Sequence, residues 1–323
     1  MTIRNWARLL ALALIPLAPA AAAQDYPSKP IRIIVPFAPG GNVDITARTV
    51  APVMAEILNQ SVIVENRAGA GGMIGAEAAM RSPPDGYTLL MGSNSSLSVA
   101  PNLYSKWPYD PIKGIAPISN LQTVPFVLVV RDGLPAKSVA DLIRLAKEKP
   151  GGLTMASAGN GSSNHLVGEW FQIETGVKFT HVPYKGGGPA MTDLLAGQVD
   201  LYFDQATTTV PNLKSGRIRA LAVASERRWP ALGDTPTFDE AGVKSFVVSN
   251  ITGLVAPAGV PPETIAKLHA AVTKALAAPA VKERFAALGV EAVGDTPQQF
   301  AAFIEQDLAR WKKVVQAAGV KVE

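Results

Sequence analysis

The chain has 323 residues, no cysteine, three histidines and a formal net charge of +4 at pH 7. Without cysteine it forms no disulfide, and no two histidines stand at metal-ligand spacing, so we expect neither a metal site nor a cofactor. Lysines and arginines are scattered rather than clustered, which predicts no nucleic-acid partner.

The first 23 residues have the pattern of a secretory signal peptide. Arg4 and Arg8 precede an apolar run at residues 9–17, and small residues lead to Ala23. The run is shorter than the ~20 apolar residues that cross a bilayer, so a membrane anchor is the weaker interpretation. We therefore expect cleavage after Ala23 and export to the periplasm, with the loss of the two arginines taking the formal charge from +4 to +2.

Short apolar runs that predict strands alternate with amphipathic segments along most of the chain. The first run, IRIIVPF at residues 31–37, precedes a helical segment whose apolar residues recur at three- and four-residue steps: Val43, Ala47, Val50, Met54 and Ile57. Later runs include SVIVEN, YTLLMGS, FVLVV, LTMASAG, KFTHVPY, VDLYFDQ and IRALAVAS. Strands that alternate with helices predict an α/β fold with a largely parallel, doubly wound sheet.

The last part of the chain is predicted to be helical. Residues 262–288 are expected to form one long helix, and residues 297–318 a second. Thr296, Pro297 and Gln299 supply the N-cap, the first helical position and the capping box of the second helix. Its buried stripe would consist of Phe300, Ile304, Leu308 and Trp311. We expect both helices to pack on the first half of the fold.

Four predicted strands end in turns of small residues: PFAPGGNVD, MGSNSS, SAGNGSSNH and PYKGGGPA. In open α/β sheets, ligands bind beyond the carboxyl ends of the strands, where the following helices begin. Helix starts carry unpaired N–H groups and a partial positive charge, so they favour anions. One such turn is ordinary turn chemistry, but four of them, divided between two halves of the chain, predict an anion-binding cleft.

Nucleotide binding and catalysis fit the motifs of the sequence less well than anion binding does. The segment GAGGMIG at residues 69–75 lacks the Lys-Ser/Thr of a phosphate-binding loop, and Ile74 stands where the dinucleotide fingerprint has Gly or Ala. No G-x-S-x-G occurs, and His165 falls in the first turn of a helix beginning near Ser162, where it orients the turn or packs locally. Ser162 and Ser163 are therefore interpreted as donors. An exported hydrolase remains the alternative, and it requires a nucleophile–base pair that the sequence does not reveal.

In their order and spacing, the motifs resemble the extracytoplasmic solute-binding proteins of tripartite tricarboxylate transporters, the Bug family. They include PFAPGGNVDITAR, ENRAGAGGMIGAEAA, PDGYTLLMGS, SAGNGSSNHL, VPYKGGGPAMTDLLAGQVDLYFD and GLVAPAGVPPE, which together extend over essentially the whole chain after the signal. The resemblance implies a two-lobed "Venus flytrap" fold, each lobe a mostly parallel sheet flanked by helices. Such a receptor closes on a small organic acid and delivers it to membrane subunits. Lobe 1 would comprise residues 24–124 and 252–323 and lobe 2 residues 125–251, with crossovers near Val124 and Ile251.

Carried onto matching positions, the resemblance implies ligand contacts for Phe37, Gly40, Gly41, Ser93, Asn94, Asn160, Gly161, Ser162, Ser163, Tyr184 and Asp204. No arginine lies within the four turns, so backbone groups, hydroxyls and bridging water would hold the carboxylate. Candidate ligands are dicarboxylates, tricarboxylates, aromatic acids and acidic amino acids. An ionised Asp204 in the cleft would favour an acid that also carries an ammonium group.

Two further expectations concern the ligand and the partners. Ile251 stands about where the family often has an aromatic residue, so the ligand preference of other members does not transfer directly. We expect a monomer that works with the membrane subunits of a transporter. A sensory role, in which the closed protein touches a membrane kinase, would use the same site.

Overall fold

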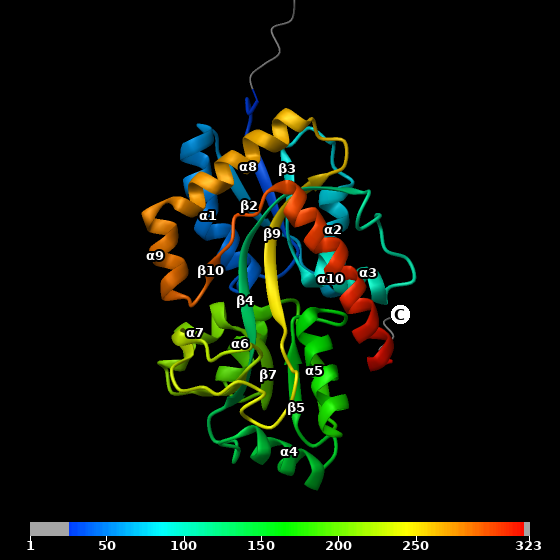
Figure 1. Ribbon diagram of the computed structural model, residues 1–323, viewed down its shortest axis with the longest axis vertical. Coiled ribbons are helices and arrows are strands. Elements are labelled where there is room, and N and C mark those ends of the chain that lie inside the picture. Colours follow the sequence, from blue (N-terminus) through cyan, green and yellow to red (C-terminus); the bar gives the residue numbers. More distant parts are fainter. Residues whose placement is uncertain (1–25, 320–323) are drawn as a thin grey trace, which may run out of the picture.

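The computed structural model describes residues 26–319, so the predicted signal peptide lies outside the described residues. Two α/β lobes lie one above the other and are joined by long central strands (Figure 1). Within residues 26–319, no helix is both long enough and apolar enough to cross a membrane. The predicted α/β fold is confirmed.

The first lobe is built on three parallel strands. The apolar run at the start of the chain forms the central one, and Ile31, Ile33, Ile34 and Val35 are fully buried within it. The strands are β1 (Ile31–Val35), β2 (Val62–Asn66) and β3 (Thr88–Ser93), and the helical elements between and after them are α1 (Asn42–Leu58), η1 (Ala70–Gly72), α2 (Met73–Met80), η2 (Ser95–Val99) and α3 (Ala100–Leu103).

The predicted apolar stripe of α1 is buried except at its end. Val43, Ala47, Val50 and Met54 lie in the core, whereas Ile57 is 37% exposed near the last turn. The segment after Ser95 is a π-helix rather than an ordinary α-helix, so five successive residues, Ser95–Val99, are wound more widely and all are buried.

The second lobe has the same alternation. Strand β5 pairs in parallel with β6 and β7, and β4 pairs antiparallel with β7 and β8. Its elements are β4 (Ile115–Arg131), α4 (Val139–Glu148), β5 (Thr154–Ser157), α5 (Ser163–Thr175), β6 (Thr180–Pro183), α6 (Gly187–Leu195), β7 (Leu201–Gln205), α7 (Ala206–Leu213), β8 (Ile218–Val223) and η3 (Pro230–Leu232).

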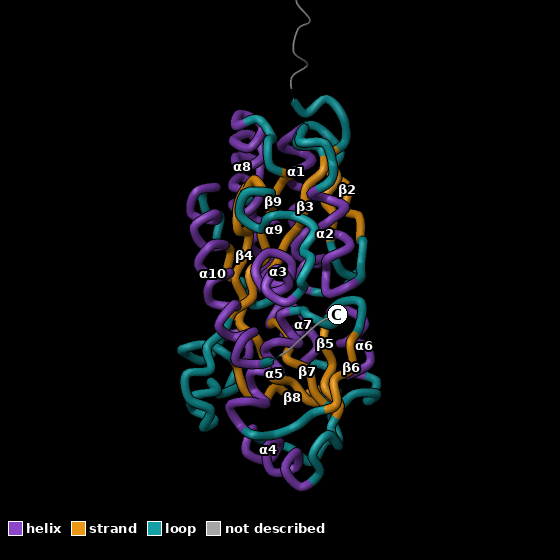
Figure 2. The backbone as a smooth tube through the Cα atoms, turned by 90° about the vertical axis from the view of Figure 1, so that its right-hand side faces the viewer, coloured by secondary structure: helices purple, strands orange, loops and turns teal. Residues whose placement is uncertain are grey.

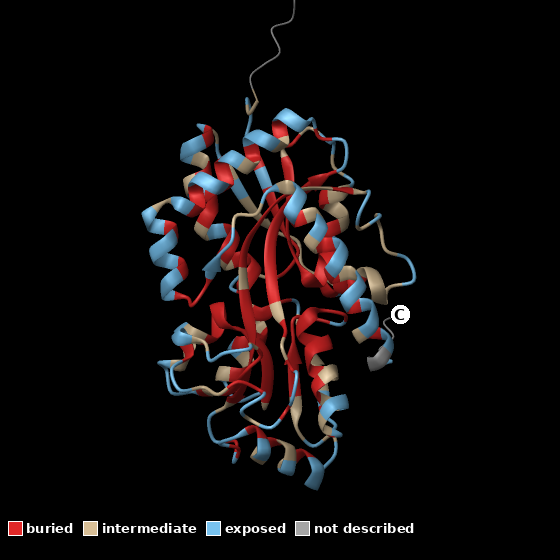
Figure 3. Cartoon of the chain, in the orientation of Figure 1, coloured by how far each residue is buried: buried red, intermediate tan, exposed pale blue. Residues whose placement is uncertain are grey.

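Two long strands, β4 and β9 (Ser249–Pro257), connect the lobes. The sheet order is β2-β1-β3-β9-β4-β7-β5-β6, so β4 and β9 stand at its centre. They are antiparallel, and Val124 pairs with Asn250 where they pass from one lobe to the other. The predicted crossovers near Val124 and Ile251 lie on these two strands and stay predictions. Figure 2 shows the strands of both lobes between flanking helices, and Figure 3 shows β4 and β9 buried almost throughout.

The prediction of one helix over residues 262–288 is wrong. The structure has α8 (Pro262–Ala277) and α9 (Pro279–Ala287). Pro279 has no N–H to continue the helix, and it holds the residue before it in an extended conformation, with Ala278 at ψ 137°. After β10 (Glu291–Ala292), α10 (Pro297–Ala318) has the predicted bounds and the predicted Thr296–Gln299 capping box.

Helix α10 packs on both lobes rather than on the first alone. Phe300 and Ile304, in its first turns, belong to an apolar cluster of the first lobe. Trp311 and Val315, further along, belong to the cluster of the second lobe that contains Phe246. Figure 1 shows α10 running down beside the central strands to reach α5. The lobes are therefore connected by two strands and braced by one helix.

Candidate functional site: a cavity between the lobes

A cavity of about 20 Å³ lies between the lobes. It has room for about one water molecule, so the lobes are closed on each other and would separate slightly to hold an organic acid. The lining residues are Phe37, Gly41, Asn42, Val43, Asp44, Ser93 and Ser95 from the first lobe, Ala158, Ser163, Asn164, Gly187 and Gln205 from the second, and Asn250 on β9.

Four helices begin at this cavity. The first residues of α1, α5 and α6 (Asn42, Ser163 and Gly187) line it, as does Gln205, the N-cap of α7. Their unpaired N–H groups and partial positive charges point toward one region. Among residues 26–319, no lysine, arginine or histidine lines the cavity. The site therefore attracts an anion with helix starts and neutral donors.

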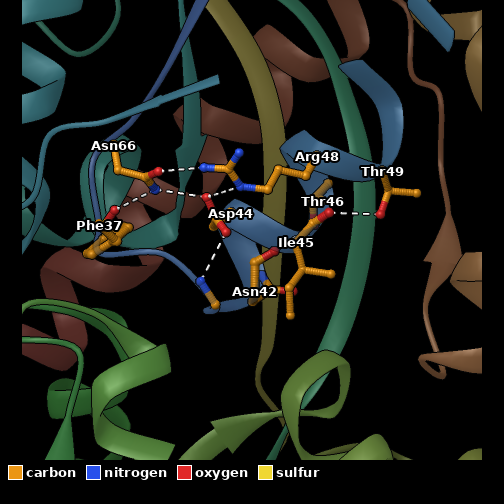
Figure 4. Close-up of polar contacts among 9 residues, drawn as sticks. Phe37, Asn42, Asp44, Ile45, Thr46, Arg48, Thr49 and Asn66 are labelled. Atoms are coloured by element: carbon orange, nitrogen blue, oxygen red, sulfur yellow. Dashed lines mark hydrogen bonds and ion pairs between the residues drawn. The ribbon is translucent and has the colours of Figure 1, made fainter. Parts of the chain in front are cut away.

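Asp44 is the one ionisable side chain in the lining, and its charge is already engaged (Figure 4). One carboxylate oxygen accepts from the Gly40 N–H at 3.0 Å, and the other from Arg48 Nε at 3.0 Å and Asn66 Nδ2 at 2.8 Å. Asn66 Nδ2 also donates to the Phe37 carbonyl. Asp44 thus fixes the first glycine turn through the Gly40 N–H, and Arg48 offsets the negative charge of Asp44.

Hydroxyl and amide groups meet across the cavity. Ser95 Oγ, on η2, lies 3.0 Å from Ser163 Oγ and accepts from the Ser163 N–H at 2.9 Å. Ser163 Oγ also donates to Asn250 Oδ1 at 3.5 Å. A carboxylate entering here would meet two rotatable hydroxyls, a side-chain amide and the fixed first N–H of α5, all of them neutral.

A second polar cluster connects both lobes to the central strands. Asn42 Nδ2 donates to Thr252 Oγ1 on β9, and Asn42 Oδ1 accepts from Gln122 Nε2 on β4. The same oxygen accepts from Thr207 Oγ1, on α7 of the second lobe, at 2.6 Å. Asn42 therefore stands at the junction of the cavity, the hinge strands and the opposite lobe.

The structure brings four of the predicted residues together in the lining: Phe37, Gly41, Ser93 and Ser163. Others lie just behind it. Asn94 donates to Asp307 and accepts from the Ile251 N–H, and Ser162 caps α5 by accepting from the His165 N–H. Gly40 and Gly161 shape their turns at φ +84° and +73°.

Three predicted residues are not among those lining the cavity and bond to other protein groups. The Asn160 carbonyl accepts from Tyr104 Oη, and Tyr184 Oη donates to Asp193. Asp204 is fully buried, and both its oxygens accept from hydroxyls, Thr208 Oγ1 to each and Thr209 Oγ1 to one. Burial raises the pKa of Asp204 to about 6 against these hydrogen bonds, which lower it.

Sequence reasoning missed Asn42, Asp44, Ser95, Gln205 and Asn250. Asn42, Asp44 and Ser95 stand inside or beside motifs that were recognised, so the same helix-start argument extended by a few residues would have included them. Gln205 and Asn250 gave no local signal, because they reach the cavity from strands far apart in the chain.

Ile251 lies away from the cavity. Its side chain is 2% exposed and packs in the first-lobe cluster with Phe300 and Ile304. Asn250, the residue before it, is the one that lines the cavity. In this chain, the position where the family often has an aromatic residue therefore contributes to the packing of the core and not to the lining of the cavity.

A serine–histidine contact exists that the sequence did not reveal. Ser157 Oγ lies 2.6 Å from His181 Nε2, 24 residues along the chain on the adjacent strand β6. Ser157 is fully buried, does not line the cavity, and its hydroxyl also bonds to the Gly159 backbone. The Ser157 hydroxyl therefore bonds to protein groups outside the lining of the cavity.

Two α/β lobes joined by crossing strands, with a closed anion-attracting cavity between them, define the class of periplasmic binding proteins. The structure of periplasmic binding protein BugD is similar to this fold with a TM-score of 0.89 and 38% identity, covering 92% of this chain and 100% of that one. Residues 46–320 match the family described as tripartite tricarboxylate transporter family receptor. The chain belongs to this family.

Two further relatives support the assignment. Protein BugT of Bordetella pertussis (strain Tohama I) is 40% identical over 325 residues, which cover 99% of this chain and all of BugT. MatC from Rhodopseudomonas palustris, solved with bound malate, has a TM-score of 0.87 and 35% identity, covering 90% of this chain and 100% of MatC. The family is one of solute-binding receptors.

Proposed function

We propose that the chain is an exported receptor that captures a small organic carboxylate between its lobes and delivers it to the membrane subunits of a tripartite transporter. The observation that carries this proposal is the convergence of four helix starts on one cavity whose lining has no lysine, arginine or histidine within residues 26–319. The amino-terminal signal pattern supports export, and the malate bound to the related MatC supports a carboxylate ligand.

Neutral donors suffice for such a ligand. A hydrogen bond to a charged group contributes roughly 1.5–3 kcal/mol, so a few converging donors account for micromolar binding. We assign these donors to Ser95, Ser163, Asn250 and the backbone at the starts of α1 and α5. Asp204 is committed to the hydroxyls of Thr208 and Thr209, which favours a plain organic acid over one bearing an ammonium group.

Closure by a hinge motion fits the contacts between the lobes. The Ala38 N–H donates to the Lys185 carbonyl at 2.9 Å, Thr207 bonds to Asn42, and Ser163 bonds to Ser95. These contacts are backbone groups and short side chains, and each is easily exchanged for water. Strands β4 and β9 would bend while the two lobe cores move as units.

A thermal-shift screen of the purified mature protein tests the proposal. The panel begins with malate and adds citrate, aromatic acids and glutamate. An acid present at 100 times its dissociation constant should stabilise the fold by roughly 2.7 kcal/mol. The recovered acid should be unchanged. Conversion of the acid by pure protein would support the hydrolase alternative, and no stabilisation by any acid would oppose the receptor.

A further inference from the structure

Two histidine rings stack beside the serine-rich turn that begins α5. His165 on α5 and His181 on β6 have ring centroids 3.9 Å apart and planes 8° from parallel. His165 is buried and His181 half-buried. Neither ring lines the cavity, yet each bonds to a part of the turn over residues 157–163 that leads to Ser163.

His165 holds the turn through one ring nitrogen. Its Nδ1 accepts from the Gly161 N–H at 3.3 Å, so this nitrogen must carry a lone pair and the proton must lie on Nε2. Nε2 faces Glu169 Oε1 at 3.6 Å, one turn along the same helix. Protonation of Nδ1 would place an N–H against the Gly161 N–H and remove this hydrogen bond.

His181 holds the other end of the turn. Its Nε2 contacts Ser157 Oγ at 2.6 Å, and that hydroxyl accepts from the Gly159 N–H at 3.1 Å. Gly159 and Gly161 both have positive φ values, +127° and +73°, which side chains other than glycine rarely adopt. Two neutral rings thus support a backbone path that glycine alone makes accessible.

Charged and polar groups surround the pair. Glu169 on α5 is in contact with it, β5 contributes the neutral Ser157 hydroxyl, and the turn contributes the Gly161 N–H. Burial and the neighbouring His165 together lower the pKa of His181 to about 4, and Glu169 opposes both. Although burial alone would raise the pKa of Glu169, hydrogen bonding and attraction to His165 lower it.

We propose that His165 and His181, held as a stacked pair, are positioning residues for the anion-binding turn, and that carboxylate affinity falls when the Nδ1 acceptor of His165 is lost. The affinity readout rests on the proposed function. The positioning itself does not, because the hydrogen bonds of both rings to the turn are formed within residues 157–181.

The first test needs no ligand. Long-range ¹H–¹⁵N correlation spectra of the imidazoles in the full mature protein at about pH 7.5 should show His165 with its proton on Nε2. The Gly161 amide proton should exchange with solvent faster in His165→Phe than in the wild type, and His165→Asn should restore part of its protection. A proton on Nδ1 of His165, or a Gly161 amide that exchanges equally in wild type and His165→Phe, overturns the proposal.

The second test is binding affinity at about pH 7.5, with malate as the first probe and the screened acids as alternatives. His165→Phe keeps a ring in the stack but loses the acceptor, so affinity should fall roughly 5- to 10-fold. His165→Asn, whose Oδ1 accepts in place of Nδ1, should recover part of that loss.

Equal affinities of wild type and His165→Phe contradict the proposal, and so does a His165→Asn variant that recovers none of the affinity lost in His165→Phe. If the spectra agree with it but no acid binds, the positioning of the turn stands and the proposed function fails. Circular dichroism confirms that each variant is folded.

Discussion

Ser162 and Ser163 are adjacent in the chain but have different partners. Ser162 is the N-cap of α5, and its hydroxyl accepts from the His165 N–H within the same turn. Ser163 faces Ser95 of the opposite lobe and lines the cavity. We therefore expect the Ser162 hydroxyl to contribute to the stability of the fold and the Ser163 hydroxyl to contribute to ligand affinity.

This difference gives a matched pair of variants. Ser163→Ala should weaken carboxylate binding by about 1.5–3 kcal/mol, because it removes a donor to a charged group. Ser162→Ala should instead lower the free energy of unfolding by about 1 kcal/mol, the usual cost of losing an N-cap, with a smaller effect on affinity. Calorimetric titration and urea unfolding of both variants check this. The reverse assignment of the two losses would contradict the site as described.

Asp204 predicts a pH dependence of stability. Its pKa in the folded protein is raised to about 6 from 3.8, so the folded state binds the additional proton between these values. The stability that this group contributes is present below about pH 4 and is lost as pH rises through 6. Asp204→Asn does not titrate, so its free energy of unfolding relative to wild type should rise by on the order of 2–3 kcal/mol between about pH 4 and pH 7. Urea unfolding at several pH values measures this, and a constant difference would refute it.

At the scale of elements, α10 is a helix that packs on both lobes. Trp311 is 2% exposed and packs in the second-lobe cluster, whereas the next residue, Lys312, is exposed. Trp311→Ala should destabilise the protein by about 3–5 kcal/mol, as a large buried ring usually does. Lys312→Ala on the same turn should change stability by less than about 0.5 kcal/mol. Equal effects in thermal or urea unfolding would mean that α10 does not brace the second lobe.

The elements that the sequence predicted best are those whose signals are local. The bounds of α10 follow from Thr296, Pro297 and Gln299, and the buried run at residues 31–35 from its own apolar residues. The break between α8 and α9 also had a local signal, Pro279, which a continuous apolar pattern obscured. The contact of α10 with the second lobe had no local signal, because an apolar stripe does not say which surface will cover it.

At the scale of the molecule, glycine backbones of the two lobes lie close together. A Cβ on Gly188, the second residue of α6, would lie 2.2 Å from the Pro39 carbonyl oxygen in the first lobe. Gly188 is helical with an ordinary φ, so alanine there suits the second lobe itself. The side chain would obstruct only the closed arrangement.

Gly188→Ala should therefore leave folding stability nearly unchanged while lowering affinity by about tenfold or more. With saturating ligand, small-angle scattering should give the variant a larger radius of gyration than the wild type. Thr192→Ala, on an exposed position one turn along α6, is the control. A variant that closes and binds as the wild type does would show that these glycines do not meet in the liganded protein.

The pairing of strands across the whole sheet explains why only part of the site could be predicted from the sequence. Residues within one turn, such as Gly41 and Ser163, were recognised from motif and helix-start chemistry. Gln205 and Asn250 reach the cavity only through the pairing of β4, β7 and β9, and Ser157 meets His181 only through the pairing of β5 and β6. Such pairings depend on the whole sheet, and a single sequence does not specify them residue by residue.

The central claim, that neutral donors in this cavity hold an anionic carboxylate, is tested most directly by calorimetric titration with matched ligands. The best acid from the screen, malate being the first candidate, is compared with the amide of the same carbon skeleton. Helix starts and hydroxyls that select for negative charge predict one molecule of acid bound per chain and no detectable binding of the amide. Equal binding of acid and amide, or no binding of any acid, would contradict the account.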